Sequence, residues 1–130
     1  MQYARMYTAP DGETHFADVP VDFRTVEALP GRAPIELSPL VPATQVAICR
    51  LPPGWEGGWH PSPQGGFSVI LSGTLECTVS DGEARRFEPG QFVASDDVTG
   101  KGHLDRTVGP DAIVIMLVFM DPAAVLSAPA

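Results

Sequence analysis

Hydrophobic residues occur along this chain in short runs that alternate with polar positions or stop at turn residues. Runs of strand length cover residues 3–8, 44–51, 67–72 and 75–79. Short runs of this kind, bounded by Gly, Pro and Asp, predict β-strands rather than helices. The chain also has 14 Pro and 13 Gly among 130 residues, and Pro interrupts helices because it lacks a backbone N–H donor. The sequence therefore predicts an all-β fold with no helix longer than a turn or two.

Turn residues between the runs predict how neighbouring strands are joined. Ala9-Pro10-Asp11-Gly12 follows the first run and predicts a hairpin, because Pro fixes φ and Gly accepts positive φ. Only Gly73-Thr74 separates residues 67–72 from residues 75–79, which predicts that these two strands pair antiparallel. Residues 29–42 contain four prolines and are expected to form mostly loop or a sheet edge.

Two runs are apolar enough to predict buried strands. Residues 112–120 are apolar on both faces, which predicts a strand through the core with a second layer or a second subunit over its outer side. Residues 44–51 are also interpreted as a buried strand. Cys49 and Cys77 lie in such apolar segments and are expected to be reduced core residues. The Ala- and Pro-rich tail, residues 121–130, is expected to be loosely held.

Composition and charge limit the class of protein. A 13.8 kDa chain with 44% hydrophobic and 18% charged residues is expected to form one globular domain. The formal net charge of −8 repels phosphate backbones and anionic lipids, so neither nucleic acid nor a membrane is expected as a partner. The N-terminal residues lack a long apolar secretion segment, and the apolar run at residues 113–120 is too short to span a bilayer. A cytoplasmic location is therefore expected.

Two histidines carry the candidate chemistry. His60 and His103 are separated in sequence by predicted strands and turns, and a small β-barrel can bring such distant side chains into one pocket. Two imidazoles in one pocket can act as a general acid and a general base. The alternative is that His60 only caps a barrel end, with its ring bonded to a backbone carbonyl.

The segments around these histidines resemble the two sequence motifs of the cupin family. Pro53-Gly54, Trp59-His60-Pro61-Ser62-Pro63 and residues 67–73 resemble the first motif, and Phe87-Glu88-Pro89-Gly90-Gln91 with His103 resembles the second. The resemblance covers residues 44–120 and implies the jelly-roll, or double-stranded β-helix, barrel of the cupin (RmlC-like) superfamily. The chain is also similar to a group of short bacterial single-domain cupins. The resemblance further implies a homodimer.

This resemblance divides the chain into one cupin domain over residues 1–130. N-terminal strands and the Pro-rich loop are expected in residues 1–43, the barrel core in residues 44–120, and the tail beyond it.

The metal-binding form of the cupin motifs has four ligand positions, three of them usually His and one a carboxylate. In this chain the four positions are occupied by His60, Ser62, Gly66 and His103. Only two expected ligands are therefore present. A divalent Fe, Mn, Zn or Ni ion at His60 and His103 would need further donors, for which Gln64 and Asp97 are candidates.

Four further residues are candidates for ligand binding. Trp59 can stack on a planar ligand at the barrel mouth, or simply pack under its rim. Gln64 shares the strand parity of His60, and Asp97 can bond to His103 and fix its tautomer. Lys101 can reach an anionic substrate, although a solvated lysine in a turn is the common alternative. His15 is as consistent with a surface position as with a pocket.

The sequence leaves three functions open. It does not decide whether the protein is an enzyme. The first is a cupin that binds a small organic molecule in its barrel, with isomerase, cyclase or lyase chemistry by His60 and His103. The second is a metal-dependent, oxygenase-like cupin enzyme. The third is a small-molecule binding or sensing module without catalysis.

Overall fold

The computed structural model describes residues 1–124 and 126, which form twelve strands and no helix. The strands are β1 (Gln2–Thr8), β2 (Thr14–Pro20), β3 (Arg24–Val26), β4 (Ile35–Leu37), β5 (Ala43–Leu51), β6 (Glu56–His60), β7 (Gly66–Ser72), β8 (Thr74–Val79), β9 (Ala84–Phe87), β10 (Phe92–Asp96), β11 (His103–Val108) and β12 (Ile113–Met120). The prediction of an all-β fold is confirmed. Within this described part of the chain, no helix is available to cross a membrane.

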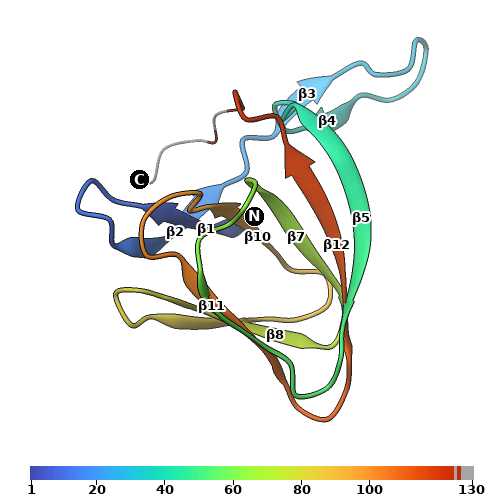
Figure 1. Ribbon diagram of the computed structural model, residues 1–130. Coiled ribbons are helices and arrows are strands. Elements are labelled where there is room, and N and C mark those ends of the chain that lie inside the picture. Colours follow the sequence, from blue (N-terminus) through green and yellow to red (C-terminus); the bar gives the residue numbers. More distant parts are fainter. Residues whose placement is uncertain (125, 127–130) are drawn as a thin grey trace.

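Two sheets enclose one apolar interior. The larger sheet has the strand order β2-β1-β10-β7-β12-β5, and the smaller has the order β6-β11-β8-β9. Figure 1 shows β8 and β11 lying across the interior from the strands of the larger sheet, while the β3–β4 hairpin projects away from both. The buried apolar side chains include Ile70, Val93, Ile113 and Ile115 from the larger sheet and Leu75, Cys77 and Val79 from the smaller. This arrangement is the predicted jelly-roll barrel.

The predicted hairpin between residues 67–72 and 75–79 is wrong. β7 pairs with β10 and β12 in the larger sheet, whereas β8 pairs with β9 and β11 in the smaller sheet. Gly73 lies between them with a φ of 80°, and a Cβ at this position would lie 2.8 Å from the carbonyl oxygen of Ala112. The glycine therefore forms a corner at which the chain crosses from one sheet to the other. A tight turn and such a corner have the same local sequence signal.

The prediction of a buried strand at residues 44–51 is also wrong, because no residue of β5 is buried and those from Ala43 to Ile48 are all exposed. β5 is the edge strand of the larger sheet and pairs only with β12. Val46 and Ile48 point away from the interior and are 64% and 63% exposed. β12 itself lies between β5 and β7, as expected of a strand that runs through the core. The apolar pattern predicted the strand correctly, but it could not show that no described part of the chain covers the outer face of β5.

Other elements agree with the pattern of turn residues. β1 and β2 form the predicted hairpin, and β1 also pairs parallel with β10, so that the N-terminal strands belong to the larger sheet. Residues 29–42 are loop apart from the short strand β4, which pairs only with β3. The prediction for the tail falls largely on residues 125 and 127–130, which lie outside the described residues.

Both cysteines are unpaired, as predicted. Cys77 is buried in the core, whereas Cys49 on the edge strand is only partly buried. Burial raises the pKa of the Cys77 thiol well above its ordinary value, and nearby Asp105 adds to that effect. Cys77 is therefore a neutral core residue at physiological pH. The cytoplasmic location stays a prediction.

Candidate functional site

His60 and His103 lie side by side on two neighbouring strands. They are direct partners in the antiparallel register of β6 and β11, and their ring centroids are 4.8 Å apart. His103 is 4% exposed, and His60 is partly buried. Because alternate residues of a strand share a face, Asp105 and Thr107 follow His103 on the inner face of β11. The structure thus brings together the two imidazoles that the sequence predicted to converge.

Two carboxylates hold the ring of His103. Its Nδ1 donates to Oδ2 of Asp97 over 2.5 Å, and its Nε2 bonds to Oδ2 of Asp105 over 3.1 Å. Asp97 directly follows β10 and has no exposed surface. Ser62 fixes this aspartate twice, because its hydroxyl donates to Oδ1 over 2.8 Å and its backbone N–H donates to the Asp97 carbonyl over 2.9 Å. Ser62, at a position where the family motif has a ligand, therefore holds Asp97 in place, and Asp97 in turn orients His103.

The two carboxylates determine the charge of His103. Burial disfavours a charged ring, but the hydrogen bonds and charges of Asp105 and Asp97 outweigh it and raise the pKa of His103 from 6.5 to about 10. Burial alone would raise the pKa of Asp105, but the hydrogen bond and charge of His103 lower it overall. At neutral pH the ring is therefore an imidazolium between two carboxylates, and these three groups carry a net charge of about −1.

His60 is held differently and keeps one ring nitrogen available. Its Nδ1 lies 2.9 Å from the carbonyl oxygen of Gly58, and since a carbonyl only accepts, Nδ1 must be the donor. In the neutral ring Nε2 is then an acceptor. The sequence analysis left open that the ring of His60 is bonded to a backbone carbonyl. Nδ1 makes such a bond, and Nε2 can still accept a proton.

Gly102 allows the two histidine segments to approach each other. Its φ is 74°, and a Cβ on it would overlap the carbonyl group of His60 and the nitrogen of Pro61. Its carbonyl oxygen accepts a hydrogen bond of 2.6 Å from the buried hydroxyl of Thr14. Thr14 is also bonded to Ser80 through both its backbone and its side chain. The turn before His103 is thereby fixed to β2 and to the end of β8.

Within residues 1–124 and 126, His60, His103 and Asp105 form a group that could hold a metal ion. Each offers one ligand atom, and these atoms lie within 4.8 Å of one another. Two histidines and one carboxylate are a donor set found in mononuclear iron enzymes. Asp97 and the Gly58 carbonyl each hold an Nδ1 atom, as outer partners of metal-bound histidines commonly do.

Sequence reasoning missed Asp105 as a site residue. It follows His103 by two residues, and side chains alternate along a strand, so the prediction of a strand from His103 onward would have placed both on one face. Strand parity with His60 indicated Gln64 instead, and nearness to the second motif indicated Asp97.

The structure places the other candidate residues as follows. Asp97 bonds directly to His103, whereas Trp59 is 54% exposed on β6. The side-chain amide of Gln64 donates to the Met120 carbonyl over 3.3 Å at one end of β12, apart from the histidine pair. Lys101 forms an ion pair with Glu13 at the surface. Ligand contacts by Trp59, Gln64 and Lys101 stay predictions.

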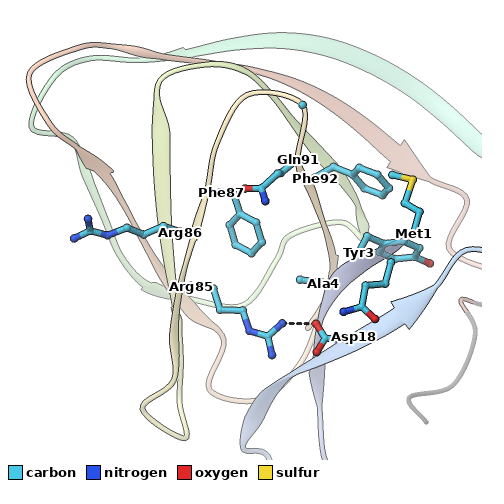
Figure 2. Close-up of a pocket in the computed structure, with 11 residues that line it drawn as sticks. Met1, Tyr3, Ala4, Asp18, Arg85, Arg86, Phe87, Gln91 and Phe92 are labelled. Carbon is cyan, nitrogen blue, oxygen red and sulfur yellow. Dashed lines mark hydrogen bonds and ion pairs between the residues drawn. The ribbon is translucent and has the colours of Figure 1, made fainter.

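A cavity of about 480 Å³ lies away from the histidines, between the N-terminal strands and β9. Figure 2 shows Arg85 reaching across it to Asp18, and this ion pair measures 2.6 Å. The guanidinium also bonds to Glu83 and lies 4.8 Å from the ring centre of Phe16. The contacts with Asp18 and Phe16 on β2 join the edges of the two sheets, so Arg85 helps to close the barrel.

Comparison with known proteins identifies the family. The description "Cupin domain" belongs to a family profile that matches residues 47–119, more than half of the chain. This protein therefore belongs to the cupin family. A search of curated proteins gives no match.

Several solved structures are similar to this chain. A conserved protein of unknown function from Streptococcus pyogenes shares 29% identity with a TM-score of 0.48, and the match covers 61% of this chain and 65% of that one. A Cupin 2 conserved barrel domain protein from Salinispora arenicola shares 22% identity, with a TM-score of 0.49 and coverage of 79% and 77%. A cupin domain from Bordetella pertussis shares 16% identity, with a TM-score of 0.49 and coverage of 78% and 95%.

Proposed function

We propose that this cupin binds a small organic molecule inside its barrel and transfers protons on it, with His60 as the base and His103 as a positively charged partner. One observation supports this proposal above the others. The acceptor nitrogen of His60 belongs to a ring that lies 4.8 Å from the ring of His103, which two carboxylates keep protonated.

The two rings suit the removal of a proton beside a carbonyl group. Nε2 of His60 takes a proton from carbon, and the negative charge that develops on the carbonyl oxygen is stabilised when that oxygen replaces Asp105 as the acceptor of the Nε2–H of His103. Return of the proton from His60 to a neighbouring carbon completes an isomerisation, and loss of a leaving group instead completes an elimination. Asp97 keeps His103 oriented and charged throughout. The proposed reaction class is accordingly an isomerase, cyclase or lyase.

Hydrogen exchange tests this proposal without knowledge of the natural substrate. The protein is incubated in D₂O with a panel of hydroxyketones, keto acids and aldoses, and deuterium at carbon is measured by mass spectrometry. We expect exchange in at least one compound, reduced about 100-fold or more by His60→Ala, since a positioned base contributes about 10²–10⁴-fold. His15→Ala is the control, because His15 is paired with Asp81 at the surface.

Two results would count against proton transfer. Exchange that is unchanged in His60→Ala would contradict the role of His60. A compound that raises the melting temperature without exchange or conversion would favour the third function, a binding or sensing module without catalysis.

A divalent metal ion at the same site is the second candidate, and the arrangement of His60, His103 and Asp105 favours it. Oδ2 of Asp105 lies 3.1 Å from Nε2 of His103, so two of the three candidate ligand atoms already adjoin each other. A bound metal would supply Lewis-acid or oxygenase chemistry.

Elemental analysis after incubation with iron, manganese, zinc or nickel tests the metal candidate. We expect close to one ion per chain, and an affinity at least about tenfold lower in Asp105→Asn, because removal of even an outer partner of a metal ligand has an effect of that size. Far less than one ion per chain with all four metals would exclude this candidate.

We also infer a homodimer, from the uncovered outer face of the larger sheet. Val46 and Ile48 on β5 and Leu71 on β7 are exposed apolar residues of one sheet, and the projecting hairpin adds Ile35 and Leu37. A second copy would bury these side chains. Analytical ultracentrifugation is expected to give twice the chain mass, and a monomer at micromolar concentration would contradict the inference.

A further inference from the structure

A second cavity, the outer-face cavity, has a volume of about 620 Å³ and lies on the outer face of the larger sheet. Its floor is formed by apolar and aromatic side chains of four neighbouring strands, namely Tyr3, Phe67, Val69, Phe92 and Val118. Along their strands these residues alternate with core residues such as Ile70 and Val93, so the floor belongs to the opposite face of the sheet. The cavity is therefore outside the barrel and apart from the histidine pair.

The segments that lead to and from the β3–β4 hairpin form the other side of the cavity. Residues 20–24 and residues 38–41 line it, and Leu126 also borders it. The N–H of Val21 donates to the carbonyl of Met1 over 2.9 Å, and Arg24 pairs with Leu37 at the start of the hairpin. The chain itself thus builds a recess between the sheet and the base of this hairpin.

The cavity is open at its rim and sheltered at its floor. Phe23 and Leu40 line it and are 48% and 83% exposed, whereas all five floor residues are partly buried. A second copy of the chain can cover Val46 and Ile48, which are exposed outside the cavity, but a flat surface does not fill a recess. A small molecule can enter from the rim and reach the floor.

Three aromatic rings dominate the floor. Tyr3 stacks on Phe92 with 5.0 Å between the ring centroids, and Phe67 meets these two rings edge-on at 5.8 and 5.9 Å. Figure 2 shows Tyr3 and Phe92 beside Met1, which lines this cavity as well. Clusters of this kind pack favourably against a further flat ring, by stacking or by edge contacts.

The charged side chains of the lining offset each other. They are Asp22 and Arg24, which form an ion pair of 2.8 Å and are both more than half exposed. A charged group on the apolar floor would lose its hydration without gaining a partner. Binding sites for small molecules are mostly apolar and measure about 300–1,000 Å³, and the outer-face cavity fits both criteria.

We propose that the outer-face cavity is a second binding site, for an uncharged molecule with a flat apolar ring system. The ring lies against Phe67 and Phe92, with Phe23 and Leu40 at the entrance. This site is independent of the barrel site of the proposed function, and it requires no reaction.

2-Naphthol and 2-naphthoate are the probes for the outer-face cavity, because they share a flat two-ring body and differ in charge. Binding is measured by NMR from the shifts of backbone amides. We expect 2-naphthol to shift the amides of Val69, Phe92 and Val118 and to leave those of His60 and His103 unchanged. 2-Naphthoate is expected to bind at least about tenfold more weakly, because its carboxylate loses hydration beside the apolar floor. Equal affinities would overturn the selection for an uncharged ligand.

Val69→Trp places an indole on the floor of the cavity, and Leu71→Trp is the matched control. Leu71 lies on the same face of β7, is 48% exposed and is not among the lining residues. We expect Val69→Trp to weaken the binding of 2-naphthol at least about tenfold, since a ring kept out of the cavity no longer buries its apolar surface. Leu71→Trp should bind 2-naphthol as the unchanged protein does. Val118→Phe narrows the cavity from β12 and provides the same test if Val69→Trp fails to fold.

Several results would overturn the proposal. Unchanged affinity in Val69→Trp or Val118→Phe would place 2-naphthol outside the cavity. Shifts confined to the amides of His60 and His103 would place it in the barrel, and the absence of any shift would show that the cavity takes no such ligand. Dissociation of a dimer by 2-naphthol, measured by analytical ultracentrifugation, would assign the cavity to a side chain of a second copy. None of these results depends on proton transfer, so the proposed function is tested separately.

Discussion

The carboxylate of Asp97 accepts a hydrogen bond of 2.5 Å from Nδ1 of His103, and the exposed fraction of the Asp97 side chain is zero. This bond fixes the orientation of the imidazole, and it directs Nε2 toward Asp105 and His60. The partner of the site histidine comes from the loop after β10, six residues earlier in the chain. The chemistry of the site therefore depends on a loop residue that no ligand needs to touch.

Asp97→Asn is expected to destabilise the protein by about 1.5–3 kcal/mol, the range for hydrogen bonds to charged groups. The amide retains an acceptor oxygen but removes a negative charge, so the pKa of His103 should also fall. Urea denaturation and NMR titration of the imidazole measure the two effects. Asp111→Asn, at an exposed turn, is the control and should change neither.

The stability of the protein is expected to decrease as the pH rises above 6.5. The pKa of His103 is about 10 in the folded protein and 6.5 in the unfolded chain, so the folded state binds this proton more tightly. The resulting stabilisation is complete below pH 6.5 and is lost as the pH approaches 10. Over this window each pH unit removes at most about 1.4 kcal/mol.

Urea midpoints between pH 6.5 and 8.5 measure this dependence, below the pH at which the Cys77 thiol ionises in the unfolded chain. His103→Gln should have the flatter profile. Equal slopes in the two proteins would show that His103 is not charged in the folded state.

Gly102→Ala is expected to be much more damaging than Gly109→Ala. Both glycines have positive φ, 74° and 85°, which disfavours alanine by about 1–2 kcal/mol. Only Gly102 also faces the backbone of His60, and overpacking there should add about 1–3 kcal/mol. Thermal unfolding compares the two variants, and amide shifts of His60 and His103 should change only in Gly102→Ala. Similar losses in both variants would mean that the close approach is unimportant.

Thr14→Val is expected to cost about 1–3 kcal/mol, because it removes the hydroxyl that bonds to Gly102 and Ser80 and leaves their groups buried. The variant should also shift the backbone amide of His103 in NMR spectra, since the turn before it loses its anchor. Thr25→Val on the exposed strand β3 is the control. A stable variant with an unchanged His103 amide would contradict the anchoring role.

The alternation of polar and apolar residues was sufficient to predict several of the strands, and the resemblance to the cupin motifs was needed to predict the convergence of the two histidines. It was not sufficient to predict which strands pair. Gly73 between two apolar runs fits both a hairpin and a corner between sheets, and the choice depends on partners such as β10 and β11 that are distant in sequence. Similarly, the burial of β5 depends on whether another layer covers it, which local sequence does not encode.

In the site, too, only contacts between residues close in sequence could be predicted. Asp105 follows His103 by two residues, so a strand predicted at this point would have placed both side chains on one face. The pairing of Lys101 with Glu13 could not be predicted, because these residues are far apart in the sequence. The role of Ser62 as a support for Asp97 also required the folded structure, since 35 residues separate the two.

The free edge of β5 has a consequence for handling the protein. One side of this strand presents unpaired backbone N–H and C=O groups, next to the exposed side chains of Val46 and Ile48. Where the inferred homodimer leaves this edge uncovered, extended segments of other chains add readily to it, and the result is aggregation. Concentrated preparations should therefore precipitate sooner than those of a variant such as Ile48→Lys, in which a charge protects the edge.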